Sequence, residues 1–268
     1  MKAEVSKDEV LVSRDSAIVT LTFNRPEARN AMTWGMYQRL YEVCEEVDAD
    51  DSIRVLVLKG AAGKDGAVKA FVAGTDISQF TRFKGAEDGI KYERDGDKRS
   101  GRVARVKKPV IAQIEGYAVG GGFAIAAGAD IRIATPDAKF GVPTARTLGN
   151  TLSMRTYAMF ADLLGASRVK ELMFTARLMS ADEARTAGFV HEIVPNDQIE
   201  ARVGELAKKI AGHAPLTLWS TKESLRRLQE ARPLPDGDDI VRKVYGSDDF
   251  GEGVRAFVEK RPPRWTGK

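Results

Sequence analysis

The sequence has few of the side chains that most often act as nucleophiles, bases or metal ligands: one cysteine, Cys44, and two histidines, His191 and His213. A single cysteine cannot form a disulfide within the chain, which fits a reducing compartment. Both histidines lie in the C-terminal half, and we interpret His191 and Cys44 as structural. The sequence therefore disfavours a Ser/His/Asp or Cys/His catalytic device. We expect no metal, because no local spacing of histidine, cysteine and acidic residues suits one.

Long apolar runs are also missing. No uninterrupted run approaches the roughly 20 residues that a membrane-spanning helix needs. Residues 1–8 are rich in charge and lack the apolar stretch of a signal peptide. We therefore expect a cytoplasmic protein without a membrane partner.

The excess of positive charge is small: 42 lysine and arginine residues stand against 38 aspartate and glutamate residues. The surplus gathers in residues 82–108, which we interpret as a solvated helical segment. The alternative is a mouth that attracts an anionic ligand, such as a phosphorylated one. We expect no nucleic-acid partner, because the sequence has no zinc-knuckle spacing, no basic region before heptads and no RNA-binding aromatic signature.

The 268 residues, 43% of them hydrophobic, are enough for one large domain with a buried core. Strands are expected at 17–23, 53–58, 70–73, 109–115 and 130–134, alternating with helical patterns. This alternation predicts an α/β fold. After residue 161 the pattern is mainly helical. We expect a core of residues 1–200 followed by a helical region of residues 201–268.

A glycine cluster is the strongest local signal for a functional site. Gly120, Gly121 and Gly122 lie between a predicted strand and an apolar helix, and their spacing does not fit a dinucleotide fingerprint. Free N–H groups at such a helix start can cradle an oxyanion, although tight helix–strand packing also requires glycine. Residues 73–76 form a second strand end that opens a helix. Two N–H clusters that face one carbonyl oxygen would suit the chemistry of a thioester enolate.

The chain resembles the enoyl-CoA hydratase/isomerase (crotonase) family in an ordered series of motifs, from about residue 15 to residue 265. These motifs are Asn-Arg-Pro-Glu-Ala-Arg-Asn-Ala at 24–31, Phe-Val-Ala-Gly-Thr-Asp-Ile at 71–77, Lys-Pro-Val-Ile-Ala at 108–112, Gly-Tyr-Ala-Val-Gly-Gly-Gly at 116–122, Asp130, Ala-Lys-Phe-Gly at 138–141, Ala-Asp-Glu-Ala at 181–184, Gly-Phe-Val at 188–190 and Phe-Val-Glu-Lys-Arg at 257–261.

The resemblance implies a fold, an assembly and a ligand. The fold is an α/β spiral of repeated β-β-α turns, with a C-terminal helical region that forms trimers or dimers of trimers. The ligand is a coenzyme A thioester, bound as substrate with no permanent cofactor, its carbonyl oxygen held by the N–H groups of Thr75 and Gly121. By position, the residues expected around coenzyme A are Arg29, Ala31, Ala73, Gly74, Asp76, Ile77, Gly120, Phe257 and Lys260, the last two reaching the coenzyme A of a neighbouring subunit.

The sequence departs from the hydratases of this family at the two glutamate positions. Ala124 stands at the first and Thr144 at the second, and neither side chain can move a proton at neutral pH. Family decarboxylases also lack the pair, because the loss of CO2 creates the enolate without a base. In such a reaction Thr144 or Arg146 could orient the carboxylate of the substrate. We therefore expect altered chemistry, such as decarboxylation of a malonyl-type acyl-CoA.

Two alternatives remain open from the sequence. The first is a hydratase or isomerase whose acid comes from elsewhere, with Glu115, Glu87, Tyr92 and Glu93 as candidates. The second is an acyl-CoA-binding protein that has kept the fold and lost its catalytic acids.

Overall fold

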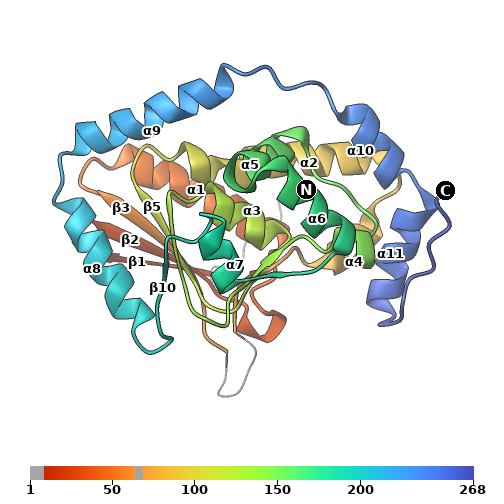
Figure 1. The fold of residues 1–268 in the computed structure, drawn as a ribbon, viewed down its shortest axis with the longest axis horizontal. Helices are drawn as coiled ribbons and strands as arrows, with labels where there is room; N and C mark the ends of the chain where they lie inside the picture. Colours follow the sequence, from red (N-terminus) through yellow and green to blue (C-terminus); the bar gives the residue numbers. More distant parts are fainter. Residues whose placement is uncertain (1–8, 64–68) are drawn as a thin grey trace.

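The computed structural model describes residues 9–63 and 69–268, arranged as two β-sheets surrounded by helices (Figure 1). The larger sheet has the order β1-β2-β3-β5-β7-β10 and is parallel except for the β1–β2 pair. Its strands are β1 (Val10–Asp15), β2 (Ile18–Phe23), β3 (Val55–Gly60), β5 (Val110–Ile114), β7 (Ile131–Ala134) and β10 (Glu192–Ile193). The smaller sheet consists of β4 (Ala70–Ala73), β6 (Tyr117–Val119), β8 (Lys139–Gly141) and β9 (Met179–Ser180).

The helices connect these strands and then form the C-terminal part of the chain. They are α1 (Trp34–Ala49), α2 (Ala86–Arg99), α3 (Gly121–Gly128), α4 (Thr144–Thr147), α5 (Met154–Leu164), α6 (Ala166–Thr175), α7 (Ala181–Thr186), α8 (Ile199–Ala211), α9 (Pro215–Glu230), α10 (Asp238–Tyr245) and α11 (Asp248–Val258). Short 3-10 helices occur as η1 (Pro26–Ala28), η2 (Ile77–Arg82) and η3 (Ser100–Arg105). Among the described residues no helix has both the length and the apolar character needed to cross a membrane.

The five predicted strands correspond to β2, β3, β4, β5 and β7, whose side chains are buried or alternate between buried and partly exposed. β1 has no apolar or alternating sequence pattern along its whole length that predicts a strand, because only Val10 of its six residues is buried. The strands β6, β8, β9 and β10 have only two or three residues each, too few to produce a periodic pattern.

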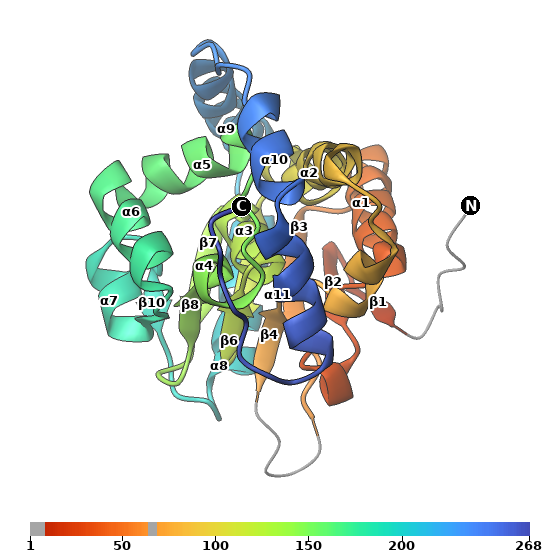
Figure 2. The same cartoon turned by 90° about the vertical axis from the view of Figure 1, so that its right-hand side faces the viewer.

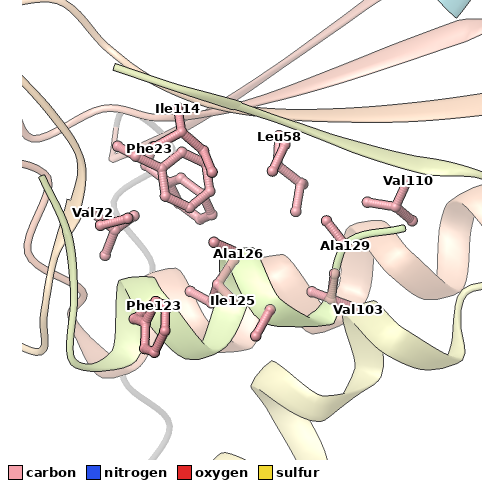
Figure 3. Close-up of a cluster of buried hydrophobic side chains, with 14 of the residues drawn as sticks. Phe23, Leu58, Val72, Val103, Val110, Ile114, Phe123, Ile125, Ala126 and Ala129 are labelled. Carbon is pink, nitrogen blue, oxygen red and sulfur yellow. The ribbon is translucent and has the colours of Figure 1, made fainter. Parts of the chain in front are cut away.

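The main core lies between one face of the larger sheet and α3 (Figure 3). Successive strand residues point to opposite faces, so Leu56 and Leu58 of β3 enter this core while Val55 and Val57 face the other way. That second face is covered by α8, whose Val203 and neighbours pack on it. Both faces of the parallel sheet are therefore buried, as its nearly continuous apolar strands require.

The C-terminal helices take two different positions. α10 and α11 return to the body of the molecule and contact α2 and η2. α9 has no buried residue and extends across the top of the molecule (Figures 1 and 2). It still contacts the body, because Leu218 packs against the core under α8 and Lys222 Nζ donates to Asp130 Oδ2. The division into residues 1–200 and 201–268 stays a prediction.

Candidate active site

The parallel pair β4–β6 brings two backbone turns together. Ala73 and Val119 are in register at the ends of these strands. The next residues, Gly74 and Gly120, are in close contact: a Cβ atom added to Gly120 would lie 3.6 Å from the Cα atom of Gly74. Both glycines have positive φ angles, 93° and 56°, which glycine adopts with little strain. Thr75 and Gly121 follow directly and are therefore neighbours at one edge of the sheet.

The N–H groups of Thr75 and Gly121 are available to a ligand. Gly121 is the first residue of α3, so its N–H has no acceptor within the helix. Within the described ranges, neither N–H donates a hydrogen bond to another residue. The turn at Thr75 is held on both sides, because Met32 N donates to Gly74 O and Asp76 N donates to Met32 O, each at 2.9 Å. The arrangement suits the stabilisation of a developing oxyanion.

Two tyrosines surround the Thr75 hydroxyl. Oγ1 of Thr75 lies 2.8 Å from Tyr37 Oη and 3.0 Å from Tyr92 Oη. Burial raises the pKa of Tyr37 to about 12 and that of Tyr92 well above its ordinary value, so both phenols stay neutral. Tyr37 is a residue of the site that carries no distinguishing signal in the sequence. It occupies a position of the apolar face of α1, and only the contact with Thr75 distinguishes it from a core residue.

Ala124 and Thr144, at which the family resemblance predicts the glutamates of a hydratase, line the same cavity. Ala124 lies one turn into α3, and Thr144 is the first residue of α4. Thr144 is buried, and its Oγ1 has no hydrogen-bond partner among the described residues. An unpaired buried hydroxyl is unfavourable unless a ligand completes its hydrogen bond. Thr144 therefore brings to the cavity a buried hydroxyl without a partner among the described residues.

Among the acids that line the cavity, Glu93 of α2 is buried. Its Oε1 accepts a 2.6 Å hydrogen bond from Tyr245 Oη and its Oε2 accepts a 2.8 Å bond from Ser153 N. Burial raises the pKa of Glu93 to about 8. The segment 82–108 is therefore helical but not simply solvated, because α2 buries one face that includes Ile90 and Glu93.

Other candidates from the sequence lie elsewhere. The side chain of Arg146 is exposed on α4 and is not part of the cavity lining, so the expected carboxylate-orienting role does not fit its position. Glu115 forms an ion pair with Lys69 at 2.9 Å, and Glu87 pairs with Arg242 at 3.0 Å. Neither acid lines the cavity. α4 is too short to have shown in the sequence which of its side chains turns inward.

Most residues expected around coenzyme A line one side of the cavity: Arg29, Ala31, Ala73, Gly74, Asp76, Ile77, Gly120 and Phe257. Lys260 is exposed and lies outside the lining. Asp76 also has a structural role, because its Oδ1 accepts from Ser78 N at the start of η2 and its Oδ2 pairs with Arg25 at 3.1 Å. Asp76 thus stabilises the turn that presents the N–H of Thr75.

The cavity is large, with a volume of about 2480 Å³. It extends from the turn at Arg29 past Thr75 and Gly121 to the space beneath α9, where Leu225 and Arg226 line it. It is lined by apolar side chains together with both basic and acidic ones, and it has room for a long ligand with apolar and charged parts.

The remaining reactive side chains are structural. Cys44 is buried in the core, and burial raises the pKa of its thiol to about 12. His191 Nδ1 accepts a 3.1 Å hydrogen bond from Arg132 N, and burial lowers the pKa of this imidazole. Neither residue lines the cavity.

Comparison with known proteins gives a consistent result. A profile of the family described as enoyl-CoA hydratase/isomerase matches residues 13–268. The chain is 32% identical to a short-chain-enoyl-CoA hydratase of Clostridium acetobutylicum, over 95% of this chain and 96% of that one. It is 34% identical to the enoyl-CoA hydratase EchA19 of Mycobacterium tuberculosis, over 98% of both chains.

Among solved structures, a methylmalonyl-CoA decarboxylase in complex with 2-nitronate-propionyl-CoA is similar to this chain with a TM-score of 0.87 and 27% identity. The match covers 97% of this chain and 99% of that one. An enoyl-CoA hydratase/carnithine racemase from Magnetospirillum magneticum is similar with a TM-score of 0.78 and 34% identity, over 98% and 97% of the two chains. These similarities confirm the predicted α/β fold class with its C-terminal helical region.

Proposed function

The chain belongs to the enoyl-CoA hydratase/isomerase family and is an enzyme of that family, and we propose that it decarboxylates a malonyl-type acyl-CoA. One observation carries the proposal: Ala124 and Thr144 both line the cavity beside Thr75 and Gly121, and neither can transfer a proton at neutral pH. Hydration needs one group to take a proton from water and one to give a proton to the α-carbon. Decarboxylation needs no base.

In this reaction the bond between the α-carbon and the carboxylate breaks. Its electron pair moves into the thioester, and negative charge develops on the carbonyl oxygen. The N–H groups of Thr75 and Gly121 stabilise that charge, which is absent from the ground state, so they lower the barrier and not only the binding energy. CO2 leaves, and the enolate then takes up one proton at the α-carbon.

The free hydroxyl of Thr144 has a place in this scheme. Its Oγ1 is buried without a partner among the described residues and can donate one hydrogen bond to the carboxylate of the substrate. The similarity to methylmalonyl-CoA decarboxylases, over nearly the whole chain, supports the same reaction class. Arg146 is not included, because its side chain is exposed.

One alternative has an observation in its favour. The relatives from Clostridium acetobutylicum and Mycobacterium tuberculosis are named enoyl-CoA hydratases, and Glu93 is a carboxyl group in the cavity. A hydratase or isomerase that uses Glu93 as its acid would account for both. This alternative is weaker because hydration also needs a base. A carboxyl with a pKa of about 8 is protonated at neutral pH and cannot act as that base.

The deciding experiment compares substrates under identical conditions. Purified protein is given malonyl-CoA, methylmalonyl-CoA and crotonyl-CoA, and kcat/KM is measured for CO2 release and for loss of the enoyl-thioester absorbance. We expect decarboxylation of at least one carboxyacyl-CoA to exceed hydration at least 100-fold. Efficient hydration of crotonyl-CoA without CO2 release from either malonyl compound would refute the proposal in favour of the alternative.

Members of this family act on coenzyme A thioesters. We propose that the coenzyme A moiety binds along the side lined by Arg29, Ala73 and Ile77, with no permanently bound cofactor. A cytoplasmic location is likewise proposed, from the low cysteine content.

We also propose a homo-oligomer, a trimer or dimer of trimers. α9 exposes the large apolar side chains of Leu216, Trp219, Leu225 and Leu228, and exposed apolar surface of this kind favours an interface. Phe257 is half-exposed at the cavity rim and is a candidate to contact a neighbouring copy's coenzyme A. The molar mass in solution, by sedimentation equilibrium, tests this: a monomer at micromolar concentration would refute it.

A further inference from the structure

Glu93 is a buried acid without a counter-cation. It lies in the middle of α2 and is 9% exposed. In the described part of the chain no lysine, arginine or histidine forms an ion pair with it, and the charge that acts on it most directly is another acid, Asp97. Burial of an unpaired carboxyl costs free energy. A role in the cavity that it lines explains why the chain keeps it.

The surroundings of Glu93 are built to hold it in place. Gly89, one turn earlier in α2, leaves room for the ring of Tyr245: a Cβ atom at Gly89 would lie 2.2 Å from Tyr245 Cγ. This close approach of α2 and α10 lets Tyr245 Oη reach Oε1 of Glu93, while Ser153 N, in the loop before α5, reaches Oε2. Each bond uses one oxygen, so a further lone pair or a proton remains free for a third partner.

Glu93 interacts electrostatically with two tyrosines that contact Thr75. Tyr92, which precedes it in α2, contacts Thr75 Oγ1 at 3.0 Å, and Tyr37 contacts the same oxygen at 2.8 Å. The charge of Glu93 acts on both phenols and contributes to their raised pKa values, after burial. Glu93, the two tyrosines, Thr75 and Gly121 all line the cavity.

We infer that Glu93 is the acid that transfers a proton to the α-carbon of the enolate held by Thr75 and Gly121. This inference rests on the proposed function and adds a catalytic residue on α2, apart from the positions of Ala124 and Thr144.

Transfer of the Glu93 proton to the α-carbon completes the decarboxylation. After CO2 has left, the electron pair of the enolate forms a bond between the α-carbon and the proton of the Glu93 carboxyl. The thioester carbonyl is restored, and Glu93 is left as a carboxylate, which takes a proton from solvent. The net change consumes one proton and releases one CO2. A neutral acid suits this cavity, because a second negative charge would repel the carboxylate of the substrate.

Burial favours the protonated form of Glu93, and so does the nearby acid Asp97, whereas the hydrogen bonds from Tyr245 Oη and Ser153 N favour the charged form. The phenols of Tyr245 on α10, Tyr37 on α1 and Tyr92 on its own helix stay neutral because their pKa values are raised. Asp97 accepts a hydrogen bond from Ser153 Oγ at 2.6 Å, and burial raises its pKa too. With a pKa of about 8, Glu93 holds its proton at neutral pH and becomes a base in mild alkali.

The test uses the reverse proton movement, which needs no carboxyl group on the substrate. Propionyl-CoA is incubated with the full-length protein in D2O, and exchange of its α-hydrogens is followed by NMR between pD 6 and 10. We expect enzyme-dependent exchange that rises with pD through a midpoint near 8. The Glu93→Gln variant should exchange at least 100-fold more slowly. Glu87→Gln, which removes an exposed acid from the same helix, should leave the rate unchanged.

Tyr245→Phe separates catalysis from structure, because it removes the hydrogen bond to Glu93 but keeps the carboxyl. Exchange should persist in this variant with its pD midpoint moved upward, since a donor to the carboxylate is lost. If Glu93→Gln exchanges at the wild-type rate, or if Tyr245→Phe loses exchange as fully as Glu93→Gln, the inference is wrong.

Decarboxylation measured on the same preparations distinguishes this inference from the proposed function. Wild-type protein that decarboxylates but exchanges no α-hydrogen would overturn the role of Glu93 and leave the proposed function standing. Exchange that depends on Glu93, without decarboxylation, would overturn the proposed function and leave the role of Glu93 as an acid standing. Absence of both activities would refute both.

Discussion

Tyr245 of α10 donates a 2.6 Å hydrogen bond from its phenol to Oε1 of Glu93 in α2, and so connects the C-terminal helices to the acid of the cavity. The two residues are 152 positions apart in the sequence. Burial around this pair keeps Glu93 protonated at neutral pH, because its pKa rises to about 8. The C-terminal region thus supplies a hydrogen-bond donor to a buried acid that lines the cavity.

The raised pKa of Glu93 predicts a specific dependence of stability on pH. An unfolded glutamate loses its proton near its ordinary pKa of 4.5, whereas folded Glu93 keeps it until about pH 8. Its contribution is therefore fully present below pH 4.5 and is lost as the pH rises toward 8. Relative to Glu93→Gln, the wild-type free energy of unfolding should fall by about 1.4 kcal/mol per pH unit between pH 5.5 and 7.5. Denaturant titrations at three pH values measure the free energy of unfolding of both proteins. If it changes with pH by the same amount in the wild type and in Glu93→Gln, the prediction is wrong.

Gly121 is required by the phenol of Tyr37. A Cβ atom at Gly121 would lie 2.2 Å from Tyr37 Oη but 3.4 Å from Tyr37 Cζ. Gly121→Ala should therefore displace the turn or the phenol and reduce kcat/KM about 100-fold. Tyr37→Phe removes the clashing atom, so the double variant should recover at least tenfold over Gly121→Ala alone. Steady-state kinetics of the four proteins complete the cycle, and failure of Tyr37→Phe to rescue would show that the clash is not the cause.

Thr144→Val removes a buried hydroxyl that bonds to no described residue. Because no internal hydrogen bond is lost, the free energy of unfolding should stay the same or rise slightly. Turnover of a carboxyacyl-CoA should fall about tenfold, the value of one lost hydrogen bond to a charged group. Thr135→Val is the matched control, since Thr135 is fully buried outside the cavity. Equal activity of Thr144→Val and the wild type would exclude a role for Thr144 in the reaction.

Two glycines of α2 give opposite predictions. Gly89→Ala places a methyl group against the ring of Tyr245 and should destabilise the fold by about 1–3 kcal/mol, through overpacking. Gly96→Ala meets no atom within 4 Å and should stabilise the fold by up to about 1 kcal/mol, through helix propensity. Thermal unfolding of both variants measures the difference. Equal effects would contradict the close contact between α2 and α10.

The part of the site that depends on backbone turns could be expected from the sequence. Gly120 and Gly121 precede an apolar helix and Thr75 follows an apolar strand, so both turns could be expected. That the two turns meet depends on the parallel pairing of β4 with β6, and β6 is too short to predict. The motifs around them also carry the family resemblance. The central strands were predictable for a similar reason, because burial on both faces leaves an apolar run.

The sequence could not show which side chains line the cavity and complete the site. Glu93 stands in a helix with many charged residues, and only the packing of α10 over Gly89 shows that it is buried. Tyr37 occupies an apolar face that sequence periodicity assigns to the core. Arg146 and Thr144 are two residues apart, and the direction of one short helix decides that Thr144 lines the cavity while Arg146 is exposed. These assignments depend on tertiary contacts between distant segments.

The most direct test of the account is a competition between the two reactions in one sample. Equimolar crotonyl-CoA and methylmalonyl-CoA labelled with ¹³C in the free carboxyl are given to the protein, and both are followed by NMR. We expect the label to appear as ¹³CO2 and bicarbonate while the crotonyl signals persist. Formation of 3-hydroxybutyryl-CoA while the label stays in the free carboxyl of methylmalonyl-CoA would contradict decarboxylation and assign the cavity to hydration.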